Sequence, residues 1–173
     1  MSLYFVANGP SPTTVAQVPV TTGTALKTLL QIKKGASSNT LGCIVEWGIS
    51  FNGFALALPI KCELLSTKAV NATITEFVAA DIINLGDPNA AAVTDDFPLA
   101  FGAGGDESGY TATAEGTITA TRMFDVQFIS PMGQYVKQFP LGREPIFNAA
   151  EFIRIRVTAN AAVDAYCYMI VQV

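Results

Sequence analysis

Residues 43–65 read CIVEWGISFNGFALALPIKCELL, and this stretch decides the fold class. Two sets of side chains alternate in its first half: Cys43, Val45, Trp47, Ile49 and Phe51 on one side, and Ile44, Glu46, Gly48 and Ser50 on the other. A period of two with β-branched and aromatic residues predicts a strand with one buried face. Trp47 is the only tryptophan, and its large ring is placed to anchor a core.

Asn52-Gly53 follows this strand and predicts a hairpin, because both positions accept positive φ. The returning strand would carry Ile60, Cys62 and Leu64. The turn could instead run on to Pro59, which cannot donate to a strand ladder.

The C-terminal part of the chain shows two more alternating stretches. Residues 151–158 place Ile153, Ile155 and Val157 on one face, with Arg154 and Arg156 on the other. Residues 163–173 are apolar on both faces, which predicts a strand at the centre of a sandwich or against a partner.

Weaker patterns complete the fold. Strands are expected at 3–7 (a strand or an arm), 15–20, 26–32, 70–75, 111–121, 124–128 and 134–141. Residues 26–32 could be helical by propensity, but the short run between a Thr-rich stretch and Gly35 favours a strand. Residues 76–85 are the best helical candidate, with an irregular loop as the alternative, and residues 89–109 are expected to form a long surface connection.

Roughly eight to ten strands separated by turns predict an all-β fold: an antiparallel β-sandwich, jelly-roll-like, with at most one short helix. A closed barrel is the alternative. The length of 173 residues suits an N-terminal strand or arm (1–12) and a single β-sandwich domain (13–173).

Composition bounds the possible functions. Charged residues make up 14% of the chain, against about 25% in typical soluble domains. With 50% hydrophobic residues, this favours an oligomer or assembly subunit over a monomer with a sticky surface. The net charge of −4 argues against nucleic acid. No apolar run approaches the roughly 20 residues that span a membrane, and no signal peptide is visible.

The residues do not predict an enzyme. The chain has no histidine, which removes Ser-His-Asp and Cys-His arrangements and His-based metal sites. The acidic pairs Asp95-Asp96 and Asp106-Glu107 lack a calcium-loop pattern and are expected in a solvated loop. No cofactor or metal is therefore predicted.

The three cysteines, Cys43, Cys62 and Cys167, are isolated thiols in apolar strand patterns, typical of a protein made in a reducing cytoplasm. A Cys43–Cys62 disulfide requires the hairpin register to align them.

Five residues are candidates for an interface: Arg154, Arg156, Tyr166, Tyr168 and Glu46. The two arginines offer planar forks for a partner's carboxylates, or simply line an outward sheet face. Tyr166 and Tyr168 would form a subunit interface, a sugar platform or part of the core. Glu46 would pair with Lys61 across the hairpin, with Arg154 or Arg156, or with a neighbouring subunit.

Several segments spread over most of the chain carry a resemblance: GTALKTLLQ (23–31), VEWGISFNG (45–53), PIKCELL (59–65), TAEGTIT (113–119), FPLGREP (139–145) and FIRIRV (152–157). Together they resemble the head decoration, or cement, proteins of tailed bacteriophages. The resemblance implies a sandwich or jelly-roll subunit on the capsid exterior of the virion, made in the host cytoplasm. Its partners would be the major capsid protein and itself, as a homotrimer, and the family supplies no catalytic residues.

In that setting we expect the C-terminal strand and the Arg154/Arg156 face near the subunit interface. The 89–109 loop or the 1–12 arm would contact the capsid. Another virion component, in a tail or fibre base, and a carbohydrate-binding module are the alternative functions.

Overall fold

The computed structural model describes residues 2–36, 40–53, 58–90, 93–94, 97–101 and 107–173. Nearly all of its regular structure is strand: β1 (Leu3–Ala7), β2 (Val20–Thr21), β3 (Leu26–Lys33), β4 (Gly42–Asn52), β5 (Ile60–Ser66), β6 (Thr73–Glu76), β7 (Ile83–Asn84), β8 (Gly109–Ala114), β9 (Arg122–Ile129), β10 (Gln134–Gln138), β11 (Ile146–Phe147), β12 (Phe152–Thr158) and β13 (Asp164–Gln172). A 3-10 helix, η1, covers Ala79–Asp81.

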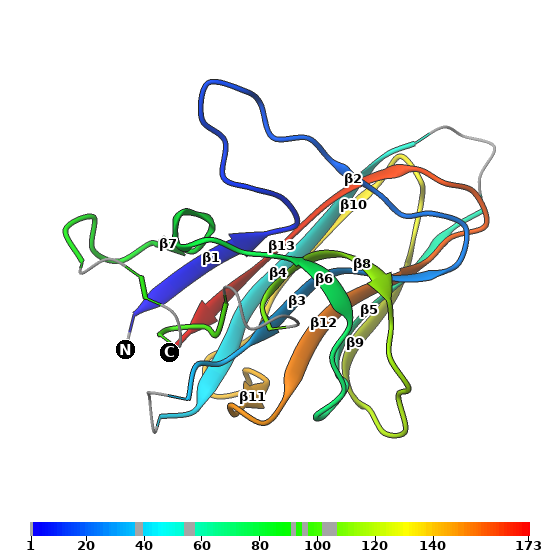
Figure 1. Cartoon of the computed structure of the whole chain (residues 1–173). Helices are drawn as coiled ribbons and strands as arrows, with labels where there is room; N and C mark the ends of the chain where they lie inside the picture. The colour runs from blue at the N-terminus through cyan, green and yellow to red at the C-terminus, as the bar shows by residue number, and fades with distance from the viewer. Residues whose placement is uncertain (1, 37–39, 54–57, 91–92, 95–96, 102–106) are drawn as a thin grey trace.

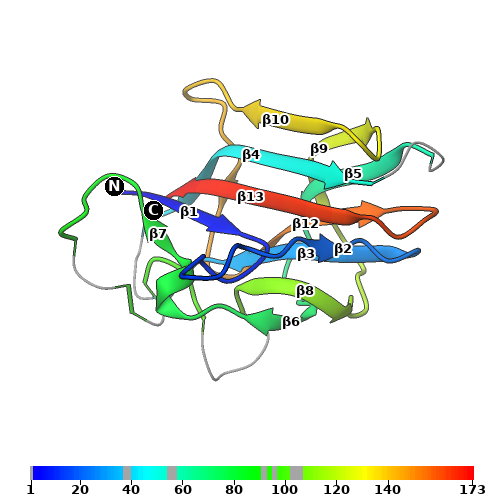
Figure 2. The same ribbon diagram turned by 90° about the horizontal axis from the view of Figure 1, so that it is seen from above.

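The strands form two antiparallel sheets packed face to face (Figures 1 and 2). Sheet A has the order β10-β4-β13-β1-β7, with β11 on β4 and β2 on β13. Sheet B has the order β6-β8-β3-β12-β5-β9. The predicted β-sandwich is confirmed, and the two separate sheets exclude the barrel alternative.

Eight of the strands pair in a nested pattern. The first pairs with the last (β1 with β13), and inside that pair lie β3 with β12, β4 with β10, and β5 with β9. The chain is thus one long antiparallel hairpin wound around itself, and the pairs β4–β13 and β5–β12 close each four-stranded layer. This nesting is the jelly roll.

Residues 67–121, at the tip of the nested hairpin, form an insertion between β5 and β9. Within it, β6 and β8 extend sheet B beyond β3, and β7 pairs with β1 at the edge of sheet A. The expected helix at 76–85 is wrong, since the single turn of η1 gives way directly to β7. The two apolar side chains Leu99 and Phe101 are buried, so the expected surface connection at 89–109 is partly wrong.

The predicted alternation along β4 is wrong at its start. The register of β4 against β13 shifts at Val45, which is left without a cross-strand partner. This bulge switches the inward face, because the residue that it adds offsets the period of two. Ile44 therefore joins Trp47 in the core, whereas Cys43 and Val45 are only half-buried.

The predicted hairpin at Asn52-Gly53 is also wrong. β5 begins at Ile60, after the longer connection to Pro59, but it pairs with β9 and β12 in the opposite sheet. Gly53 instead allows the backbone to pass close to Pro131. Its N–H donates to the Pro131 carbonyl at 2.9 Å, and a Cβ at position 53 would lie only 2.5 Å from that oxygen. The Cys43–Cys62 disulfide is excluded, and all three cysteines are free.

The other strand predictions hold to different extents. β1 is a strand inside sheet A, between β13 and β7, and so residues 3–7 are not an arm beside the sandwich. The strand expected at 15–20 is reduced to β2. β13 is central, as its two apolar faces predicted, with β4 and β1 on either side.

Candidate interaction surface

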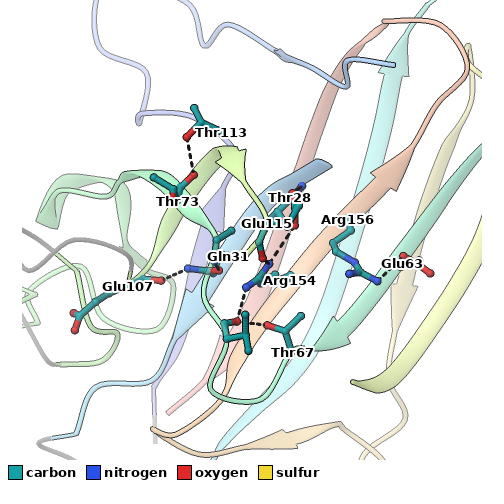
Figure 3. A network of polar contacts seen from close by, with 12 residues as sticks. Thr28, Gln31, Glu63, Thr67, Thr73, Glu107, Thr113, Glu115, Arg154 and Arg156 are labelled. Atoms are coloured by element: carbon teal, nitrogen blue, oxygen red, sulfur yellow. Dashed lines mark hydrogen bonds and ion pairs between the residues drawn. The ribbon is translucent and has the colours of Figure 1, made fainter. Parts of the chain in front are cut away.

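Arg154 is on the outer face of sheet B but is fully buried, because the insertion covers it (Figure 3). One guanidinium nitrogen donates to the Glu115 carbonyl at 3.0 Å and to its carboxylate at 3.1 Å, and another donates to the Val70 carbonyl. Glu115 also accepts from the Thr28 N–H and hydroxyl, at 2.5 and 2.6 Å. Burial lowers the pKa of Arg154 to about 10, although Glu115 opposes this shift.

Arg156 likewise has its partner within the chain. It donates to Glu63 at 3.0 Å, and Lys61 pairs with the same carboxylate at 2.6 Å. Arg156 and Glu63 are both buried. The expectation that these arginines present open forks to a partner is therefore wrong for this chain: both point outward from the core, but into contacts with their own chain.

The outer face of sheet A holds the other three candidates. Tyr166 and Tyr168 point outward from β13, and β4 carries Glu46 opposite Ile170 and Gly48 opposite Tyr168. On the other side of β13, Phe5 of β1 is opposite Ile170. We call Phe5, Tyr166, Tyr168 and Ile170 the aromatic face.

Tyr168 is held by three neighbours on this face. Its ring stacks on Phe5 with centroids 5.4 Å apart, and its hydroxyl donates to Glu46 at 2.6 Å. It also lies directly over Gly48, where a Cβ would come within 2.4 Å of the ring. Burial and the hydrogen bond to Glu46 raise the pKa of Tyr168. Glu46 thus bonds a tyrosine, and the expected pairings with Lys61, Arg154 or Arg156 are wrong.

The aromatic face is poor in charge. Among the outward positions of β1, β13, β4 and β10, two side chains are charged: Glu46, and Asp164 at the start of β13, opposite Asn52. The others are apolar, aromatic, Gly or uncharged polar residues. Depletion of charge with enrichment in Tyr and Phe is typical of the core of a protein interface.

Two hollows flank Tyr166. A hollow of about 540 Å³ lies between β1, β7 and the segment after β1, and its apolar lining includes Phe5, Ala7, Pro12, Ile83, Leu85 and Tyr166. A smaller one of about 190 Å³ lies toward β10, where Val136 and Gln134 join Tyr166 and Tyr168. Tyr166 forms no hydrogen bond through its hydroxyl within the described part of the chain.

A second apolar surface lies on the opposite side of the sandwich. β9 is the edge strand of sheet B and turns Met123, Val126 and Phe128 outward, with Phe128 71% exposed. We call these three residues the β9 strip. Edge strands are prone to associate with other chains, and β9 presents these apolar side chains beside one exposed cation, Lys61, which lies opposite Phe128.

Sequence reasoning missed Phe5, Ile83 and the β9 strip. The signal was present in residues 122–129, RMFDVQFI, where a lone Asp interrupts an apolar strand. Asp125 is in fact the buried member: it accepts from Trp47 Nε1 at 3.2 Å and from the Tyr135 hydroxyl at 3.0 Å. Since Asp125 points inward, Val126 and Phe128 point outward, whereas Phe124 packs against the core at the shift in the β5–β9 register.

The remaining sequence candidates do not form a site. Asp95, Asp96 and Asp106 lie outside the described residues, and Glu107 pairs with Lys33 at 3.3 Å. In the described part of the chain, no group of three or more His, Cys, Asp or Glu side chains is placed to hold a metal ion. Likewise, no helix among the described residues has the length and hydropathy to span a bilayer.

No family model, curated protein or solved structure matches the chain.

Proposed function

We propose that the protein is a non-enzymatic structural component of a tailed-bacteriophage virion, which decorates the capsid exterior and bridges capsid subunits as an oligomer. The observation that carries the proposal is the presence of two largely apolar surfaces with few charges, the aromatic face and the β9 strip, on opposite sides of one small sandwich. A protein that bridges neighbours must contact at least two of them at once, and each contact needs its own surface.

Energetics supports this role. A cement protein binds the assembled shell and not the free capsid subunit, so it stabilises the assembly by mass action. Several weak contacts made by one oligomer also act together through their effective concentration. The jelly roll is shared by many viral capsid domains and by lectins, and so the fold is compatible with the role without selecting it.

The test is to coexpress the chain with the major capsid protein of the phage that encodes it and to purify the assembled heads. We expect the chain on the heads but not on unassembled capsid protein. Phe128→Asp should lower the amount of chain bound to the heads at least about tenfold, because the substitution removes a large apolar side chain from the contact and buries a charge in its place. Val78→Asp is the matched control, since Val78 is also exposed but lies outside both surfaces.

Heads that carry no wild-type chain would contradict the proposal. Immunogold labelling of whole virions then separates a head component from the tail or fibre-base alternative.

A carbohydrate-binding module is the second candidate, favoured by Tyr166, whose free hydroxyl and ring border both hollows. Sugars are bound by stacking on aromatic rings with hydrogen bonds at the rim, as ligand sites in general combine apolar walls with a few polar groups. Binding on a glycan array that is lost in Tyr166→Ala would support this candidate, and an array without hits would remove it.

A further inference from the structure

The segment between β1 and β2, residues 10–19, is exposed and uncharged. The first charged residue of the whole chain is Lys27, so this segment, PSPTTVAQVP, has no charged side chain. Val15 and Val18 are each 69% exposed. Figure 1 shows the segment as the blue loop that projects beyond the sandwich.

The segment is hydrogen-bonded to the rest of the described chain at its two ends only. At its start the Ser11 N–H donates to the Asp81 carboxylate at 2.8 Å, and at its end Val20 pairs with Ala165 of β13. No hydrogen bond joins residues 12–19 to other described residues. Prolines at 10, 12 and 19 restrict the backbone, so the segment would lose little conformational entropy on binding.

The larger hollow lies against the inner side of the same segment. Pro12 and Gln17 form one wall, and Phe5, Ile83 and Leu85 line it from β1 and from β7 and its end. Asp81 is at the edge of the hollow, but both of its carboxylate oxygens already accept backbone N–H groups, of Ser11 and Val78. The hollow therefore suits an uncharged, apolar occupant.

We infer that residues 10–19 of one copy seat Val15 and Val18 in this hollow of a second copy. The segment cannot fill the hollow of its own chain, because it forms the wall of that hollow. Each copy thus presents an uncharged projection with two exposed valines beside a mainly apolar cavity whose one carboxylate, Asp81, already has its hydrogen-bond partners, and the two match in chemistry. Because projection and cavity lie side by side on each copy, two copies can exchange them reciprocally in a two-fold dimer, or the contact can run head-to-tail into a ring or chain. The inference rests on the oligomer in the proposed function and names the surfaces that build it.

The test compares three purified proteins by size-exclusion chromatography with light scattering. The wild-type chain should be an oligomer. The projection variant, Val15→Asp/Val18→Asp, and the cavity variant, Leu85→Asp, should each raise the dissociation constant at least about tenfold. Leu141→Asp is the matched control, because Leu141 is fully exposed and outside both surfaces. A cooperative thermal unfolding transition in each variant shows that the substituted chains fold.

Mixing the two variants gives the decisive measurement. The cavity variant keeps its projection and the projection variant keeps its cavity, so an equimolar mixture should form a heterodimer and no larger species. A wild-type chain that is monomeric at all concentrations would overturn the inference, and so would variants that remain fully oligomeric. A capsid or glycan as the occupant would appear as a monomer whose binding to heads or sugars is lost in Leu85→Asp.

The two proposals can fail separately. A chain that is monomeric but still binds heads contradicts this inference alone. A chain that self-associates through these surfaces but leaves heads bare contradicts the proposed function alone.

Discussion

At the scale of single residues, Asp125 joins the two sheets at the β9–β10 edge. Its carboxylate lies between the layers and accepts from Trp47 of β4, Tyr135 of β10 and Gln127 of its own strand. Lys137 completes the cluster at 3.3 Å. Burial disfavours the charged form of Asp125, but hydrogen bonds from Gln127, Tyr135 and Lys137 and the charge of Lys137 outweigh it and lower the pKa of Asp125.

Asp125→Asn should therefore destabilise the protein in a pH-dependent way. At neutral pH we expect a loss of about 1–3 kcal/mol in the free energy of unfolding, since polar partners are left poorly paired. The native pKa lies below the unfolded value of about 3.9, so the wild type loses this contribution as pH falls from about 4 through the native pKa. The variant has no such contribution to lose. Urea unfolding from about pH 7 down to about pH 3 measures the free energy of unfolding against pH for both proteins. Two parallel profiles would contradict the lowered pKa of Asp125. Asp164→Asn is the control, because Asp164 is exposed.

Gly48 should be irreplaceable for a different reason. A Cβ at this position would lie 2.4 Å from the Tyr168 ring, so Gly48→Ala must displace the ring and break its bond to Glu46. We expect a cost of about 1–3 kcal/mol. Tyr168→Phe keeps the ring in place and loses only the hydroxyl, at about 0.5–1.5 kcal/mol. Thermal unfolding compares the two, and equal costs would show that the ring is not seated on Gly48.

Residue-level reasoning from sequence succeeded where the periodicity was uninterrupted. β13 alternates without a bulge over its C-terminal apolar run, and a central place in the sheet was one of its two predicted positions; which of its two apolar faces points inward was not predicted. β4 carries a bulge at Val45, and no feature of the sequence marks it. The residues before the bulge, Cys43 and Ile44, were therefore assigned to the wrong faces of the strand. Asn52-Gly53 failed because the dipeptide shows that the chain turns but not which strand it then meets.

At the scale of elements, the insertion is fastened by apolar side chains that enter the core, among them Phe77 and Leu99, and by a set of polar contacts to sheet B. Arg154 of β12 binds Val70 and Glu115, and Gln31 of β3 donates to the Glu107 carbonyl and accepts from the Ala72 N–H, both at 2.8 Å. Both side chains are fully buried. A pattern that predicted Arg154 to point away from the core was right in direction, but only the fold reveals that residues 67–121 return to cover it.

Arg154→Met should loosen the insertion before it loosens the sandwich. Removing one partner of a buried ion pair costs about 3–5 kcal/mol, because Glu115 is left without its cation. Hydrogen exchange should accelerate first in β6 and β8, with β4 and β13 still protected. In the double variant Arg154→Met/Glu115→Gln the unpaired charge is gone, so the combined cost should be smaller than the sum of the two single costs. Uniform acceleration across all strands would show that the insertion and the sandwich unfold as one unit.

At the scale of the whole molecule, the nested fold determines where the excess of apolar residues in this weakly charged chain reaches the surface. The jelly roll covers the inner faces of both sheets, and the insertion covers much of the outer face of sheet B. The β9 strip and most of residues 10–19 are left exposed, and the aromatic face is half-exposed. The composition alone predicted such an excess, but its location depended on β9 and β13 taking places in opposite sheets, which no local pattern specifies.

If a second copy supplies the missing cover, the stability of the fold must depend on protein concentration. For an oligomer that unfolds to monomers, mass action favours the native state as concentration rises, whereas a monomer shows no such effect. For a dimeric contact, a tenfold increase in concentration adds about 1.4 kcal/mol per dimer, which corresponds to roughly 2 °C in the unfolding midpoint for a chain of this size. Differential scanning fluorimetry or calorimetry across a hundredfold range, about 4 °C in all, measures the shift. The Val15→Asp/Val18→Asp variant should unfold at one temperature throughout, because it has lost the contact and not the fold. If the wild-type unfolding midpoint also stays constant as concentration rises, a single copy tolerates the exposed apolar surface. Only binding to the capsid would then remain as a reason for that surface.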